Sequence, residues 1–170
     1  MARADVVARN LLAEHGIDTP PVDPARLVKA LGITVVTIPF DGDITGLFIR
    51  EPGRVVVGVN QNLRLHQQRW AVAHGIGHNR FSRGRTRIVD SYSRVRTNAP
   101  ESPTDREETE ANRFAAALLL PEHLVRTAIR RTPITDARDA VARIANDFDV
   151  SDSVAEGRLV QLGILTGPIC

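Results

Sequence analysis

The chain has 170 residues, 42% of them hydrophobic and 25% charged, so it is long enough for a sizeable core and balanced like an ordinary globular protein. Its net charge of +2 is too small to predict nucleic-acid binding, and its single cysteine, Cys170, excludes an internal disulfide. A single cysteine suits a reducing cytosol, and no stretch is apolar enough to span a membrane, so we expect a cytoplasmic protein with no membrane partner.

The first thirty residues predict two helices. Residues 4–15 place Val, Ala and Leu with helical periodicity, and a glycine follows them. In DPARLVKALG, Asp23 is a candidate N-cap, proline occupies the first helical position and Gly32 marks the end.

The next segment predicts a small sheet and then a longer helix. ITVVTIPF, ITGLFIR and RVVVGVN are rich in β-branched residues and are separated by the turn sequences DGD and EPG. They predict a three-stranded antiparallel meander, followed by a helix over about residues 62–81.

The second half of the chain predicts a loop and then helices alone. Residues 83–104 lack periodicity and are rich in Arg, Ser and Thr, which favours a long surface loop. Helices are predicted over residues 105–120 and 121–131, and two more meet at residues 149–151. Helices, a small sheet and further helices predict an α+β fold.

Two histidines stand out in the stretch RWAVAHGIGHNRF. His74 and His78 are four residues apart, so a helix places both imidazoles on one face, as a shared tetrahedral zinc ion requires. They border an apolar stripe and therefore point inward. The alternative is a pair of partly buried histidines bonded to backbone carbonyl groups.

A two-histidine zinc site needs a third ligand, commonly a carboxylate. The segment DREETEANRFAAALLLP offers Glu107, Glu108 and Glu110. At about 100° per residue, Glu108 falls on the apolar face, Glu107 lies at its edge and Glu110 points away. A buried carboxylate needs a partner, and a metal supplies one. The alternative is a fraying first turn that exposes all three acids.

Four stretches in order resemble the ImmA/IrrE family of zinc metallopeptidases: PPVDPARLVKALGI, AVAHGIGH, ETEANRFAAALLLPE and IANDFDVSDSVAEGRLVQLGIL. The second resembles the family's active-site helix, and the third its second motif, whose first glutamate is a metal ligand. The resemblance implies Zn²⁺ held by His74, His78 and Glu108 in an H-E-x-x-H type site.

The resemblance also implies a domain organisation and a task. It predicts a zincin-like metallopeptidase domain over residues 1–131, with the active-site helix packed on the sheet. A helix-turn-helix-like helical segment over residues 132–170 is expected to pack on that domain. Members typically cleave a helix-turn-helix transcriptional repressor in the cytoplasm and so derepress a phage, a mobile element or a stress regulon. The expected partner is therefore a repressor protein.

The chain departs from the motif at Gly75, where H-E-x-x-H enzymes carry the glutamate that acts as general base. A general base contributes about 10²–10⁴-fold to rate, so we expect this chain to be inactive or nearly so as a peptidase. The sequence shows no packing reason for Gly75, and we therefore expect Gly75→Glu to restore activity with little loss of stability. Asp105 or an acid of the loop stays open as a substitute base.

Two other functions stay open. A pseudo-peptidase would bind a repressor or another partner without cleaving it. A DNA-binding regulator would use the C-terminal helix pair, but its second helix carries Asp152 and Glu156 against only Arg158 and Gln161. We therefore do not expect direct nucleic-acid binding.

Overall fold

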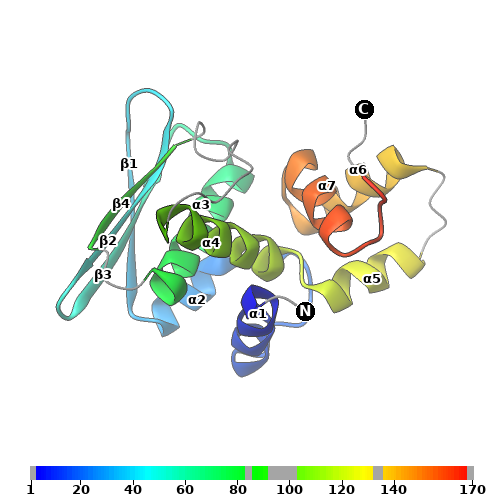
Figure 1. The fold of residues 1–170 in the computed structure, drawn as a ribbon, viewed down its shortest axis with the longest axis horizontal. Helices are drawn as coiled ribbons and strands as arrows, with labels where there is room; N and C mark the ends of the chain where they lie inside the picture. Colours follow the sequence, from blue (N-terminus) through cyan, green and yellow to red (C-terminus); the bar gives the residue numbers. More distant parts are fainter. Residues whose placement is uncertain (1–2, 83–85, 92–102, 132–135, 168–170) are drawn as a thin grey trace. The chain divides into compact units, whose positions relative to one another are not determined.

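The computed structural model describes residues 3–82, 86–91, 103–131 and 136–167 (Figure 1). The chain divides into two compact units. We call Asp23–Ala115 the sheet unit, and Met1–Val22 together with Ala116–Cys170 the helical unit. The expected boundary between residues 131 and 132 remains a prediction.

The sheet unit contains every strand and the histidine helix. In chain order its elements are α2 (Pro24–Ala30), β1 (Ile33–Ile38), β2 (Ile44–Glu51), β3 (Arg54–Asn60), α3 (Leu65–Phe81), β4 (Arg87–Ser91) and α4 (Pro103–Leu119) as far as Ala115. Asp23 caps α2 as predicted, accepting a hydrogen bond from the backbone N–H of Ala25 at 2.9 Å.

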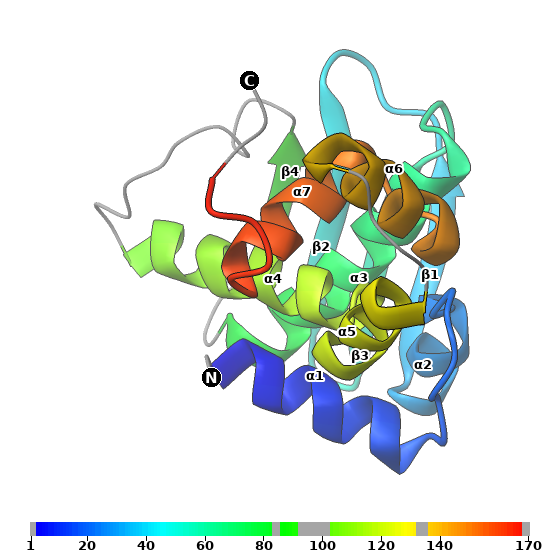
Figure 2. The same cartoon turned by 90° about the vertical axis from the view of Figure 1, so that its right-hand side faces the viewer.

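The helical unit contains α1 (Arg3–Glu14), the last turn of α4, α5 (Glu122–Arg131), α6 (Ala137–Phe148) and α7 (Asp152–Gln161). Helices α6 and α7 pack against each other (Figure 2). They meet where predicted, because Asp149 ends α6 in a left-handed conformation and the Ser151 hydroxyl caps α7 by accepting from the N–H of Val154.

The predicted three-stranded antiparallel meander is wrong in its pairing. The sheet has four strands in the order β1-β3-β2-β4, and β1 runs parallel to β3. Only β2 and β3 form the expected antiparallel hairpin, through a turn in which Gly53 has a φ of 74°. Strand β3 is almost entirely buried, which suits the centre of a sheet, whereas β1 exposes both of its threonines and lies at an edge.

The fourth strand lies inside the segment predicted to be a loop. Strand β4 pairs antiparallel with β2 and buries Ile88. Pairing with an existing edge makes these five residues a strand, although they show no clear alternation of their own. The remainder of the predicted loop, residues 83–85 and 92–102, lies outside the described residues.

The α+β class is confirmed: four strands form one small mixed sheet among the described residues, together with seven helices. Helices α2 and α3 lie on one face of the sheet in Figure 1, and α3 packs on β2 and β3. The helical segment predicted at the C-terminal end is also present. Within the described residues, no helix is both long and apolar enough to cross a membrane.

The helical unit has a buried ion pair. Arg158 of α7 is 4% exposed, and its Nη2 lies 2.6 Å from Oδ1 of Asp5 on α1. Its Nε donates a hydrogen bond to the carbonyl oxygen of Leu120 at 3.1 Å, and its Nη1 donates to Gln161 at 3.4 Å. Arg158 and Gln161 therefore interact within the unit.

We predict that Arg158→Ala lowers the free energy of unfolding by ~3 kcal/mol, because it leaves the Asp5 carboxylate without its buried partner. Urea denaturation followed by circular dichroism measures the change. Arg113→Ala is the matched control, because the exposed Arg113 pairs with Glu110 only at 3.9 Å and should change stability by less than ~1 kcal/mol. Equal losses in the two variants would contradict this structural role.

Candidate metal centre

The histidine turn of α3 is buried on all sides. Every residue from Ala73 to His78 is buried, although a helix on a surface normally exposes one face. Gly75 and Gly77 are two residues apart, so they face nearly opposite directions at about 100° per residue. His74 and His78 point into the sector between these two directions.

Gly77 faces α4 at a close approach between the two helices. A β-carbon at Gly77 would lie 2.8 Å from Cα and 2.9 Å from the carbonyl oxygen of Ala111. These distances are shorter than real β-carbons tolerate, so only glycine fits. Because Ala111 lies one turn after Glu108, the same approach brings the Glu108 carboxylate to the histidines.

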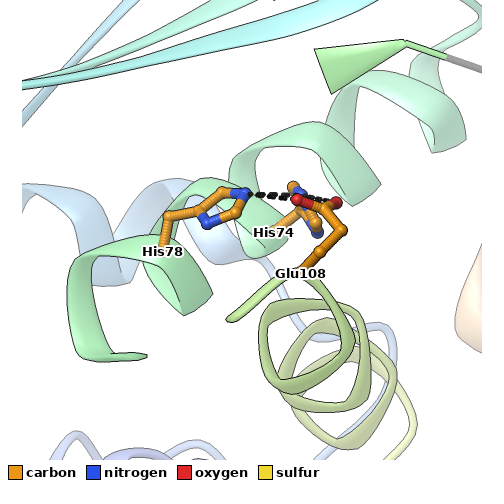
Figure 3. A group of neighbouring side chains, drawn as sticks. All are labelled: His74, His78 and Glu108. Carbon is orange, nitrogen blue, oxygen red and sulfur yellow. Dashed lines mark hydrogen bonds and ion pairs between the residues drawn. The ribbon is translucent and has the colours of Figure 1, made fainter. Parts of the chain in front are cut away.

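The three predicted ligands come together in the sheet unit (Figure 3). Nε2 of His74 lies 3.0 Å from Oε1 of Glu108, and Nε2 of His78 lies 3.4 Å from Oε2. The two Nε2 atoms are 2.8 Å apart. Among the described residues, these are the only three histidine, cysteine or acidic side chains that form such a group, with ligand atoms within 4.8 Å of one another.

Glu108 is held in its ionised form. Burial alone would raise the pKa of its carboxyl group, but hydrogen bonds and favourable charge interactions with His74 and His78 outweigh burial and lower the pKa to about 2. Glu110 instead pairs with Arg113, whose side chain is half-exposed. The helical phase inferred from the sequence therefore agrees with the structure, and neither Glu107 nor Glu110 joins the described cluster.

His78 is oriented by contacts on both sides of its ring. Its Nδ1 lies 2.9 Å from the hydroxyl oxygen of Ser82, and its ring packs on Phe48 of β2 with centroids 5.8 Å apart. A metal would take the place of the Nε2 proton that faces Glu108. With Nδ1–H donating to Ser82, Nε2 would then offer its lone pair to the metal. Both His78 and Phe48 are fully buried.

Arg50 fixes the end of α3 that carries His78 and Ser82. Its guanidinium group donates hydrogen bonds to the carbonyl oxygens of Ser82 and Asn79, the latter at 2.8 Å, and more weakly to that of His78 at 3.4 Å. A cation at the C-terminus of a helix satisfies free carbonyl groups and favours the helix dipole. Strand β2 therefore supplies both Arg50 and Phe48 to the histidine turn.

Gly75 faces the sheet, and the sequence-based view that it has no packing role is wrong. A β-carbon at Gly75 would lie 2.6 and 2.7 Å from the two methyl carbons of Val57 on β3. The neighbouring strand therefore leaves room for glycine only. The side chain of Asp105, considered above as a substitute base, is not among those described.

The donor set fits a zinc ion. Two imidazole nitrogens and a carboxylate oxygen are the ligands of many catalytic zinc sites, which leave a fourth position open. Here the three groups converge from two helices, and the carboxylate is ionised without a lysine or arginine in the cluster. A bound cation would satisfy the lone pairs of both imidazoles and the carboxylate together.

Comparison with known proteins identifies the family. The family model for the IrrE N-terminal-like domain, Peptidase M78, matches residues 28–160. The chain belongs to this family. The match spans the histidine helix and the Glu108 helix, so the Peptidase M78 scaffold contains the whole cluster described above.

Two similar proteins extend the comparison. The radiation response metalloprotease IrrE of Deinococcus deserti is 30% identical over 156 residues, which make up 91% of this chain and 53% of that protein. A Mycobacterium tuberculosis transcriptional regulator superposes with a TM-score of 0.63 at 23% identity, covering 94% of this chain and 47% of its own. The second likeness shows a shared fold. The chain spans about half the length of each protein.

Four residues that shape the site were not identified from the sequence: Ser82, Arg50, Phe48 and Val57. Ser82 left a weak signal, because it lies four residues after His78 at the end of the predicted helix. Arg50, Phe48 and Val57 showed no such signal, because their roles depend on how the sheet packs against α3.

We predict that Gly77→Ala weakens zinc binding by at least ~10-fold and destabilises the protein by ~1–3 kcal/mol, because the new methyl group meets the Ala111 backbone. Competition with a zinc chelator and thermal unfolding measure the two effects. Gly157→Ala in α7 is the control: its β-carbon meets nothing within 4 Å, so the variant should gain stability through helix propensity. Unchanged zinc affinity in Gly77→Ala would contradict the role of the close approach.

We predict that Ser82→Ala lowers zinc affinity by about 10–100-fold, because Ser82 orients the His78 ring without being a ligand. The affinity is measured by chelator competition at fixed pH. Ser153→Ala, which removes an exposed hydroxyl group in α7, should leave the affinity unchanged. If both serine variants bind zinc like the parent protein, Ser82 does not support the ligand.

Proposed function

We propose that this chain binds Zn²⁺ through His74, His78 and Glu108 on a metallopeptidase scaffold and has little or no peptidase activity. The convergence of two imidazoles and an ionised carboxylate carries this proposal. Membership of the Peptidase M78 family supports it, and a metalloprotease is among its relatives.

In such a site, the metal and the side chains of the protein would have different tasks in peptide hydrolysis. Bound zinc would act as a Lewis acid that polarises the peptide carbonyl group. Hydrolysis also needs a group that takes a proton from the attacking water and returns it to the leaving nitrogen. Gly75 has no side chain for this task, and the described cluster contains only the three ligands. Peptide cleavage should therefore be about 10²–10⁴-fold slower than with a glutamate in place.

The partner that we propose is a helix-turn-helix transcriptional repressor, bound as a poor substrate or as a ligand. The proposal follows from the family resemblance, and the names of the two similar proteins, a radiation response metalloprotease and a transcriptional regulator, support a regulatory role. We place this role in the cytoplasm, in keeping with a chain whose single cysteine excludes an internal disulfide.

A pseudo-peptidase that binds a partner without cleaving it is the second candidate. The fit between Gly75 and Val57 favours it, because it shows glycine accommodated by its surroundings. The DNA-binding alternative loses support. Arg158 of α7 is buried in an ion pair with Asp5, so this side chain is not poised to contact bases.

The first test is metal binding. We expect the purified chain to bind one zinc ion in equilibrium dialysis followed by elemental analysis, and His78→Ala and Glu108→Gln to lose stoichiometric binding. Glu110→Gln is the matched control for Glu108→Gln and should retain the ion, because Glu110 pairs with Arg113. Full retention in both His78→Ala and Glu108→Gln would refute the site.

The second readout is cleavage. The zinc-loaded protein is incubated with a proteome-derived peptide library and with the repressor encoded beside its gene, and new N-termini are identified by mass spectrometry. We expect binding of the repressor with little or no cleavage. Efficient cleavage that disappears in His78→Ala would show that another residue acts as the base.

A further inference from the structure

The surroundings of Gly75 are too close for a β-carbon unless a neighbour shifts. The histidine turn lies over a cross-strand pair, Phe48 of β2 and Val57 of β3, which face each other in the antiparallel register. Phe48 packs on the His78 ring, and Val57 lies under Gly75. The two side chains form the floor of the site and are 0% and 2% exposed.

Val57 cannot easily move away from position 75. Its side chain is branched at the β-carbon, so both methyl groups have restricted positions. It is held between β1 and β2, where Val35 and Phe48 are its register partners. Any residue other than glycine at position 75 must therefore displace either the valine or the helix.

The obstruction at Gly75 differs in kind from the one at Gly77. At Gly77 the obstructing atoms include the backbone of Ala111, which no substitution removes. At Gly75 they belong to the side chain of one residue, and the two shortest contacts are with its methyl carbons. Val57→Ala would remove both methyl groups, and of the three nearest atoms it would leave the β-carbon at 3.3 Å.

We propose that Val57 is a positioning residue that restricts position 75 to glycine, so that the scaffold excludes a general base by packing. Residue 75 follows His74 directly and lies between the histidine face and the sheet, where a carboxylate would be adjacent to the ligands. The consequence for catalysis rests on the proposed zinc site, whereas the packing relation does not. Gly75→Glu alone therefore should not restore activity, contrary to the expectation from sequence.

Thermal unfolding in the presence of a chelator tests the packing relation without the metal. Gly75→Ala should lower Tm by roughly 5–10 °C in the parent protein because it overpacks the floor. In a Val57→Ala background the same change should shift Tm by less than about 2 °C or raise it, because alanine favours the helix. The four proteins form a double-mutant cycle.

Val59→Ala provides the matched control for this cycle. Val59 lies two residues along β3 on the same face, is 1% exposed and contributes none of the three atoms nearest to the β-carbon position at Gly75. Val59→Ala should create a cavity similar to that of Val57→Ala. Gly75→Ala should therefore lower Tm in the Val59→Ala background as much as in the parent protein. Equal shifts from Gly75→Ala in the parent, Val57→Ala and Val59→Ala backgrounds would overturn the proposal.

The consequence for catalysis is tested with glutamate at position 75. Val57→Ala/Gly75→Glu should bind one metal ion, and its Co²⁺-loaded form should show a visible spectrum whose pH dependence differs from that of Val57→Ala. Cleavage of the peptide library should rise about 10²–10⁴-fold over Val57→Ala. Gly75→Glu in the parent should lose stability or metal and show no such gain.

Two outcomes separate this proposal from the proposed function. If no variant binds zinc or cobalt, the metal site fails, while the double-mutant cycle still decides whether Val57 restricts position 75. If Gly75→Glu alone is as stable as the parent and cleaves as fast as the double variant, Val57 has no such role, although the metal site stands.

Discussion

The candidate site depends on the close approach of α3 and α4 at Gly77 and Ala111. The ligands come from two helices that are distant in sequence, so their geometry is set by how closely the helix backbones pack. A glycine at the contact removes the side chain that would separate them, and Glu108, one turn before Ala111, reaches both histidines. The absence of a β-carbon at Gly77 thus determines whether the three ligand side chains form one cluster.

The sheet supports this contact from the other side of α3. Strand β2 contributes Phe48 beneath the His78 ring and Arg50 at the carbonyl end of the helix. Arg50 also lies 5.2 Å from the Phe48 ring centre, so the two supports are themselves in contact. Because Arg50 bonds to the backbone rather than to a histidine ring, it fixes the helix end and leaves the ligand nitrogens available.

Features encoded by local spacing could be predicted from the sequence. The four-residue separation of His74 and His78 and the helical phase of Glu108 required only the period of a helix, and the α+β class followed from the order of elements. The parallel pairing of β1 with β3 and the strand β4 could not, because strand partners are chosen by contacts between distant segments. The obstruction between Gly75 and Val57 depends on the distance between a helix and a strand, and this distance cannot be inferred from the spacing of residues in the sequence.

The contact between Gly75 and Val57 also bears on how such sequences change over generations. A lineage that regained a glutamate at position 75 first would carry an overpacked floor, and one that shortened Val57 first would carry a cavity. Each order passes through a less stable ancestor, and a first step that lowers stability is more readily removed by selection. If Val57 restricts position 75 as proposed, the return to a glutamate-bearing motif requires two substitutions rather than one.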